Sequence, residues 1–120
     1  MELTGTHLRY LLCMYEMDGG EDGLRLTQIA QELHVKKASA ARIIGVFREK
    51  ELVEQKPYGK VHLTAHGRET AETYKQQVDM ISDSLQRALS LERKEAYDVA
   101  CMLLPELPEH CIAKLAHTAE

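Results

Sequence analysis

The sequence lacks the features that would place the protein in a membrane or mark it as secreted. No run of about eighteen apolar residues is present, so we expect no membrane-spanning helix. The first residues show no basic segment followed by an apolar core, so we expect no secretory signal. Cys13, Cys101 and Cys111 lie far apart and form no CxxC pair, which favours reduced thiols in a cytoplasmic protein over disulfides or structural zinc.

The motifs of common enzyme classes are also missing. The chain contains no glycine-rich phosphate-binding loop, no nucleophile elbow and no HExxH motif. It also shows no acidic pair in a recognisable pocket context. We therefore expect neither an enzyme nor a bound cofactor.

The charge is unevenly distributed along a chain of ordinary globular composition. The 120 residues are 44% hydrophobic and 28% charged, with a net charge of −4. Residues 33–62 hold seven basic and three acidic side chains, whereas residues from 67 onward hold six basic and ten acidic ones. A basic middle and an acidic C-terminal part are typical of a nucleic-acid-binding module joined to a module that stays away from phosphates.

Helical spacing in the first half predicts a helix-turn-helix. After a helix over residues 6–16, a polar glycine-rich loop over 17–23 and a brief strand over 24–26, Thr27 is expected to cap a short helix over 28–34. A second helix over 37–50 follows, and Val35 is expected to fill the turn between the two. Its buried stripe is expected to be Ala40, Ile43, Ile44 and Phe47.

A hairpin follows directly. Two short strands within residues 52–64 flank Pro57, Tyr58 and Gly59, and the glycine is expected to adopt the left-handed conformation that closes a three-residue loop. A hairpin with a basic tip after such a helix pair is the wing of a winged helix.

The remainder is expected to be helical. Thr64 should cap a helix that reaches residue 89. A further helix over 91–104 should end before Pro105, and Pro108 should begin a last one. The buried face of the 91–104 helix is expected to comprise Ala96, Val99, Ala100, Leu103 and Leu104. The fold class is therefore mainly α with a small β component (α+β): a winged helix-turn-helix over residues 1–66, then a helical dimerisation region over 67–120.

The basic cluster coincides with the predicted motif, which favours contact with double-stranded DNA over a merely solvated charged surface. Side chains at the start of the second helix of such a motif contact base edges, while wing residues and helix N-termini contact phosphates. The candidate DNA-contacting residues are Thr27, Lys36, Lys37, Ser39, Arg42, Lys56, Tyr58 and Lys60.

The long predicted helix has a narrow apolar seam whose spacing alternates between three and four residues. So short a chain has few residues to cover that seam, which favours a homodimer. The residues assigned to the dimer contact are Tyr74, Val78, Ile81 and Leu85. A two-fold dimer would match two half-sites about one helical turn apart.

Three segments together resemble the metal-dependent repressors of the iron-dependent and manganese-transport regulator type, which are diphtheria-toxin-repressor-like. These segments read LTQIAQELHVKKASAARIIGVFREKELV, GKVHLTAHGRETAE and YDVACMLL. The resemblance covers nearly the whole chain and is strongest over residues 26–67. It implies a homodimeric, DNA-binding regulator that binds Fe²⁺ or Mn²⁺ between its modules.

The metal ligands of that family are mostly absent here. The family's ligand positions fall near Thr6 or Arg9 and at Val78, Ser82, Tyr97, Cys101 and the pair Leu104–Pro105. Only Cys101 has a ligand side chain of the type the family uses, and such metals prefer carboxylate and imidazole ligands. We therefore expect no metal site and no activation by iron or manganese.

Two alternatives remain open from the sequence. One is a winged-helix module that binds another protein rather than DNA, although such a module has no need of the basic face. The other is a regulator with a repurposed metal or redox sensor built from Cys13, Cys101, His110 and Cys111. Cysteines near apolar helix faces also behave as small hydrophobic residues, which needs no sensor.

Overall fold

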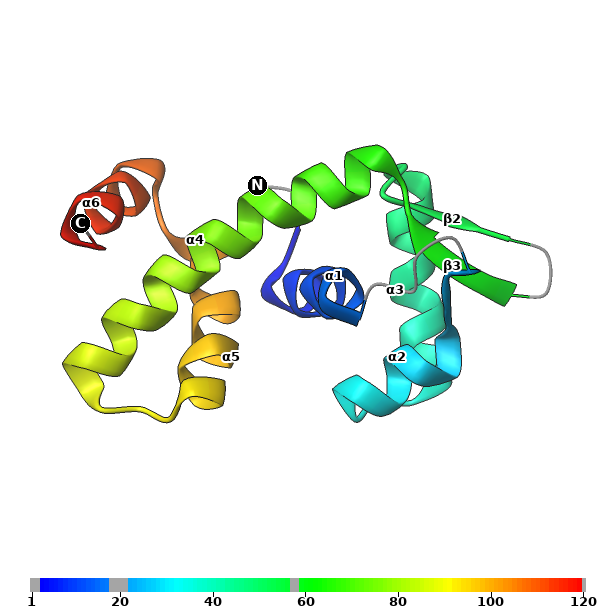
Figure 1. Ribbon diagram of the computed structural model, residues 1–120, viewed down its shortest axis with the longest axis horizontal. Coiled ribbons are helices and arrows are strands. Elements are labelled where there is room, and N and C mark those ends of the chain that lie inside the picture. Colours follow the sequence, from blue (N-terminus) through cyan, green and yellow to red (C-terminus); the bar gives the residue numbers. More distant parts are fainter. Residues whose placement is uncertain (1–2, 18–21, 57–58, 120) are drawn as a thin grey trace. The chain divides into compact units, whose positions relative to one another are not determined.

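The computed structural model describes residues 3–17, 22–56 and 59–119. Helices dominate these residues, and three short strands form one sheet (Figure 1), which confirms the predicted fold class. None of the helices in these ranges is long and apolar enough to span a membrane. In chain order the elements are α1 (Gly5–Met17), β1 (Leu24–Arg25), α2 (Leu26–Leu33), α3 (Lys37–Glu49), β2 (Val53–Gln55), β3 (Lys60–Leu63), α4 (Ala65–Leu89), α5 (Arg93–Leu103), the 3-10 turn η3 (Leu104–Glu106) and α6 (Glu109–Ala119).

The chain divides into two compact units. The sheet unit comprises residues 10–72, and the helical unit comprises residues 1–9 together with 73–120. Helices α1 and α4 therefore each contribute to both units. Each unit has its own buried residues.

The core of the sheet unit is formed where one face of each helix meets the sheet. The predicted stripe of α3 is buried as expected, and Phe47 is the largest fully buried side chain. The other core residues come from α1, α2, the strands, the residue before β2 and the start of α4; they are Tyr10, Leu11, Leu12, Met14, Leu24, Ile29, Ala30, Leu52, Val53, Val61 and Ala71. The buried stripe of α3 follows the 3.6-residue period of a helix, and in the strands Leu24 and Val61 alternate with less buried neighbours.

The sheet is antiparallel, with strand order β1-β3-β2. Leu24 pairs with Val61, and Val61 pairs on its other side with Gln55. Because successive side chains point to opposite faces, the core face holds Leu24 and Val61, and the outer face holds Arg25 and Lys60. The hairpin closes at Gly59, whose φ of +82° is the predicted left-handed conformation.

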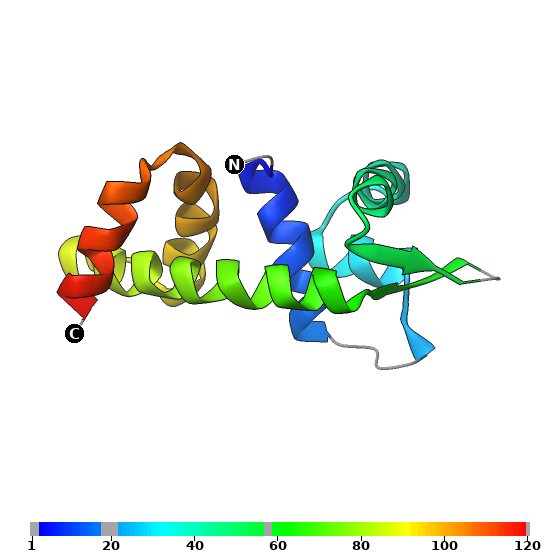
Figure 2. The same cartoon turned by 90° about the horizontal axis from the view of Figure 1, so that it is seen from above.

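Thr64 is the N-cap of α4, as predicted. Its Oγ1 accepts a hydrogen bond of 2.9 Å from the Gly67 backbone N–H, and it donates one of 2.7 Å to the Glu51 carbonyl. β3 therefore runs into α4 through one residue, as Figures 1 and 2 show. The same hydroxyl group fixes both the start of α4 and the turn that precedes β2.

The face that α5 buries differs from the predicted one. Ala96, Ala100 and Cys101 are buried, followed by Leu104 in η3, whereas Val99 and Leu103 are 40% and 37% exposed. The prediction for Val99 and Leu103 was therefore wrong. The apolar pattern of this helix extends over more than one face, so periodicity alone selected the larger side chains, whereas the helix packs inward through alanine and cysteine.

We predict that Gly67→Ala destabilises the fold, because a Cβ at this position would overlap the backbone carbonyl of Leu52. Backbone atoms cannot move aside like a flexible side chain, so the loss should be about 1–3 kcal/mol or more. Urea unfolding measures the free energy. Gly45→Ala is the matched control, since a Cβ there meets nothing within 4 Å. In α3 that change should stabilise by about 0.5–1 kcal/mol. Equal effects of the two substitutions would contradict the close contact.

Candidate nucleic-acid interface

The turn between α2 and α3 is closed by backbone hydrogen bonds. His34 adopts a left-handed conformation with φ of 56°, and the N–H groups of His34 and Val35 donate to the carbonyls of Gln31 and Ala30 at 3.2 and 3.0 Å. Val35 is 36% exposed, so the prediction that its side chain fills this turn was wrong. The backbone bonds already close the turn, and the side chain is left at the surface.

The start of α2 also differs from the prediction. The N-cap is Arg25, and Thr27 lies exposed in the first turn. The Gln28 side chain accepts a 2.8 Å hydrogen bond from the Arg25 backbone N–H, and this bond stabilises the helix start in place of a threonine hydroxyl. Thr27 is thus a surface residue near a helix N-terminus rather than its cap.

The face of α3 opposite its buried stripe is basic at its start. Lys36 is the N-cap, and Lys37 and Arg42 lie exposed on the helix. Ser39 is half-buried, and the remaining exposed residues of this first half are the small Ala38 and Ala41. The helix-turn-helix therefore presents positive charge on a face without bulky side chains that would keep a partner at a distance.

These cations differ from three cations of the helical unit, which are paired with aspartates. In the helical unit Arg9 lies 3.8 Å from Asp98, Lys75 lies 3.3 Å from Asp79, and Lys94 lies 3.7 Å from Asp98. Within the described ranges, no carboxylate lies within ion-pair distance of Lys36, Lys37 or Arg42. Positive charge without an internal partner attracts an external anion more strongly, because it is not already neutralised.

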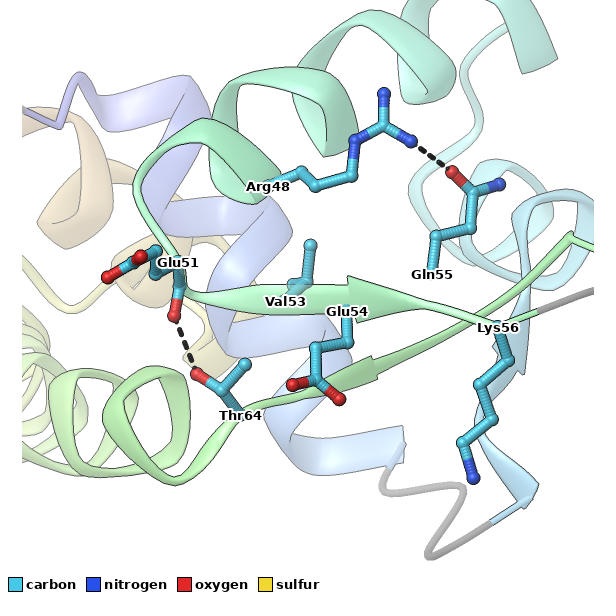
Figure 3. A pocket seen from close by; sticks show the side chains of 7 residues that line it. All are labelled: Arg48, Glu51, Val53, Glu54, Gln55, Lys56 and Thr64. Atoms are coloured by element: carbon cyan, nitrogen blue, oxygen red, sulfur yellow. Dashed lines mark hydrogen bonds between the residues drawn. The ribbon is translucent and has the colours of Figure 1, made fainter.

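Arg48, at the end of α3, has an internal role. Its Nη1 donates a 2.5 Å hydrogen bond to the Gln55 side chain of β2 (Figure 3). Both residues line a shallow hollow along β2, which also includes Glu51, Val53, Glu54, Lys56 and Thr64. Two acids and two bases line this hollow, so it offers no net charge to an anion. Arg48 ties α3 to the hairpin.

The hairpin supplies two of the predicted wing residues. Lys56 is exposed and Lys60 half-buried, and the Lys56 N–H donates to the Lys60 carbonyl at 2.7 Å. Tyr58, the third, lies outside the described residues, as does Pro57. The structure thus brings Lys56 and Lys60 together at the base of the loop.

Arg25 is a basic residue of this unit that sequence reasoning did not select. It pairs directly with Lys60 through β1 and β3. β1 has only two residues and its partner lies 35 residues further along the chain, so neither periodicity nor a turn motif reveals the pairing. Alternation in residues 24–26 could have placed Arg25 opposite the buried Leu24, but not beside Lys60.

The predicted dimer residues on α4 differ in exposure. Val78 and Ile81 are buried by the chain itself, with 0% and 2% of their surface exposed, and Tyr74 and Leu85 are half-buried. The largest exposed apolar side chains of the helical unit are elsewhere, at Leu89 and on α5 at Val99, Met102 and Leu103.

The residues at the family's metal-ligand positions do not suit a divalent cation. Val78, Cys101 and Leu104 are buried apolar or thiol side chains, Ser82 is buried, and Arg9 is already paired with an aspartate. Across the described residues, no group of three or more histidine, cysteine, aspartate or glutamate side chains is arranged to bind a metal. Buried apolar side chains offer no ligand atoms to a divalent cation, and the Arg9 guanidinium carries a charge of the same sign as the cation.

The proposed sensor residues are distributed over both units. Cys13 belongs to the sheet unit, where its Sγ lies 3.6 Å from the Met17 sulfur. Cys101, His110 and Cys111 belong to the helical unit, where the first is buried, the second exposed and the third half-buried. All three cysteines are free thiols.

One protein-family model matches the chain. It describes the N-terminal DNA-binding domain of iron-dependent repressors, and it matches residues 2–61, half of the chain. This match covers α1, the helix-turn-helix and most of the hairpin. No curated protein matches the chain.

Several solved structures share the fold. A hypothetical protein from Sulfolobus solfataricus is 22% identical, with a TM-score of 0.70, over 97% of this chain and 88% of its own. The IdeR protein of T. acidophilum is 20% identical, with a TM-score of 0.74, over 92% of this chain and 52% of its own. ScaR with bound Zn²⁺ is 20% identical, with a TM-score of 0.69, over 93% of this chain and 52% of its own. The chain therefore spans about half the length of the two named regulators.

Proposed function

The chain belongs to the iron-dependent repressor family through its N-terminal DNA-binding domain, and from that premise we propose a sequence-specific transcriptional regulator that acts as a homodimer without iron or manganese. The family and its structural neighbours are transcriptional regulators rather than enzymes. We assign DNA binding to residues 1–66 and dimerisation to residues 67–120. Such a regulator would act in the cytoplasm, in contact with the DNA.

The unpaired basic face at the start of α3 is the observation that supports sequence-specific binding. Lys36, Lys37 and Arg42 are exposed, have no carboxylate partner among the residues placed by the structure, and stand beside small side chains. A helix with this surface fits the major groove, where Arg42 can donate two hydrogen bonds to guanine O6 and N7. The lysines near the helix start are then placed for phosphate contacts.

The exposed apolar face of α5 supports the homodimer. Val99, Met102 and Leu103 have 40%, 55% and 37% of their surfaces exposed, at spacings of three and four residues. Such spacing places them on one side of the helix. Adjacent exposed apolar side chains are typical of interface centres, although a stable contact buries about 800 Å² per partner and therefore includes polar neighbours. Val78 and Ile81 are already buried within the chain. The second copy would therefore contact α5, and the half-buried Tyr74 and Leu85 would lie at most at the edge of that contact.

The same helical unit supports independence from metal. The positions that would hold ligands are occupied by buried Val78, Cys101 and Leu104. None of these three side chains is a carboxylate whose negative charge a cation would neutralise. We therefore infer that whatever regulates DNA binding in this protein differs from divalent metal.

Selection of binding sites from a random duplex library should enrich one palindromic site in the presence of chelator. The measurement is sequencing of the bound DNA after selection with chelator, with Mn²⁺ and with Fe²⁺. The three site profiles should agree, because the residues that the structure describes include no ligand set for these ions. Enrichment only with a metal would overturn the proposed independence, and no enrichment under any condition would overturn the proposed function.

Arg42→Ala should lower affinity for the selected site by about 1–3 kcal/mol and relax the preference at one base pair of each half-site. The physical reason is the loss of a paired hydrogen-bond donor at a base edge. Titration against the selected site and single-base variants gives the comparison. Arg48→Gln is the control. Because the Arg48 side chain is hydrogen-bonded to Gln55 and not directed at a base, this variant should leave the base preference unchanged. An unaltered affinity in Arg42→Ala would exclude this residue as a base contact.

Met102→Glu should dissociate the dimer, because a charge placed in an apolar contact loses its hydration without gaining a partner. Analytical ultracentrifugation would show a monomer at concentrations where the unaltered protein is a dimer. Arg87→Gln, an exposed change on α4 of the same magnitude in charge, serves as the control and should stay dimeric. A dimer that survives Met102→Glu would place the contact elsewhere.

A further inference from the structure

Three basic residues lie in one row across the outer face of the sheet. Lys60 of β3 pairs with Arg25 of β1, and on its other side the Lys56 N–H donates to the Lys60 carbonyl. Directly opposed residues of antiparallel strands project to the same face. Figure 3 shows Lys56 and Glu54 leaving β2 on the side opposite Val53 and Gln55. The row is thus Arg25, Lys60 and Lys56, one residue from each strand or its immediate end.

This arrangement is unfavourable for the isolated protein. Like charges directly opposite each other on neighbouring strands destabilise a sheet. The nearest acid of the outer face, Glu54, occupies the adjacent row, where its carboxylate lies 3.2 Å from Nε2 of its cross-strand partner His62. No carboxylate of the described residues lies within ion-pair distance of Arg25 or Lys60. The repulsion between these two residues is therefore not relieved inside the unit.

An anion at the row would remove that repulsion. Arg25 is exposed, so its planar guanidinium can donate two parallel hydrogen bonds to one phosphate, and Lys60 lies half-buried directly beside it. All three side chains of the row are cations, which attract an anion rather than a neutral base. Phosphate is therefore the group of a nucleic acid that this surface fits.

We propose that Arg25, Lys60 and Lys56 together bind one backbone phosphate of double-stranded DNA. This inference rests on the proposed function and adds Arg25, together with the sheet's outer face, to the interface of α3 and the wing. Because the contact is with a phosphate, it would contribute to affinity without altering base preference.

The test is Arg25→Gln, titrated over a range of salt concentrations against the selected site and against a random duplex. Affinity should fall on the order of tenfold at low salt for both DNAs. The slope of log K against log salt should become shallower by about 0.9 for each copy of Arg25 that contacts a phosphate. Arg25→Lys should retain much of the affinity. Arg87→Gln, with the same change in charge on α4, should leave the slope unchanged.

Loss of folding is controlled separately. The hydrogen bond at the start of α2 uses the Arg25 backbone N–H and not its side chain, so circular dichroism of Arg25→Gln should match that of the unaltered protein. Relief of the Arg25–Lys60 repulsion should also raise the thermal midpoint of Arg25→Gln in low salt, and this difference should vanish in high salt.

The outcomes separate this proposal from the proposed function. If the unaltered protein binds its site and Arg25→Gln binds with equal affinity and slope, the phosphate site is wrong and the regulator stands. A loss of affinity confined to the selected site would also overturn the phosphate site, because such a loss would indicate that Arg25 recognises a base. If the unaltered protein binds no DNA, the DNA phosphate site fails with the proposed function. Stabilisation by inorganic phosphate relative to chloride at equal ionic strength, present in the unaltered protein and absent in Arg25→Gln, would then show that the row takes phosphate from another source.

Discussion

One threonine hydroxyl joins the parts of the sheet unit that are proposed to contact DNA. Thr64 Oγ1 accepts the Gly67 N–H at the start of α4 and donates to the Glu51 carbonyl after α3, and the Thr64 N–H donates to the Leu52 carbonyl at 3.0 Å. Glu51 has a φ of 60°, which costs a non-glycine residue about 1–2 kcal/mol. These bonds hold that conformation, and with it the turn from α3 into β2. The position of the hairpin relative to α3 therefore depends on a small hydrogen-bonded cluster.

The positive surface of the sheet unit follows from where its cations lie and not from the overall composition. The net charge of the chain is −4, yet cations without a carboxylate partner among the described residues lie at the start of α3 and, as Arg25 and Lys60, on the outer face of the sheet. In the helical unit the bases at positions 9, 75 and 94 each lie within 4.0 Å of an aspartate. Ion pairs at such exposed sites contribute little to stability. They do neutralise part of the positive charge of that unit. The cations of the sheet unit are therefore the ones that attract an anionic partner more strongly.

Periodicity predicted the buried faces that repeat regularly, and failed where packing or pairing is decided at a distance. The stripe of α3 and the Thr64 cap follow from local spacing and hydrogen bonding, and both are as predicted. Both helices of the helix-turn-helix end in left-handed non-glycine residues, His34 and Glu51, which a search for a terminal glycine misses. The face buried by α5 depends on how closely its alanines pack, and the neighbour of Arg25 depends on a strand 35 residues away. Those two features require the tertiary structure. The sequence could therefore predict the basic wing and a brief strand over residues 24–26, but not the pairing of that strand with the wing.

Membership of the family does not require that this chain keep the family's metal ligands. The matched half, residues 2–61, contains the helix-turn-helix and most of the hairpin, so DNA contact depends on residues that the family model covers. The positions of the metal ligands lie mostly in the other half, where Val78, Cys101 and Leu104 contribute to a buried apolar core. Buried apolar residues stabilise a fold without a bound ion, each by about 1.5–3 kcal/mol. The packing of these positions is thus stabilised by the hydrophobic effect and needs no bound cation. That contribution does not vary with metal concentration. The buried core at these positions is therefore the physical basis of the proposed independence from iron and manganese.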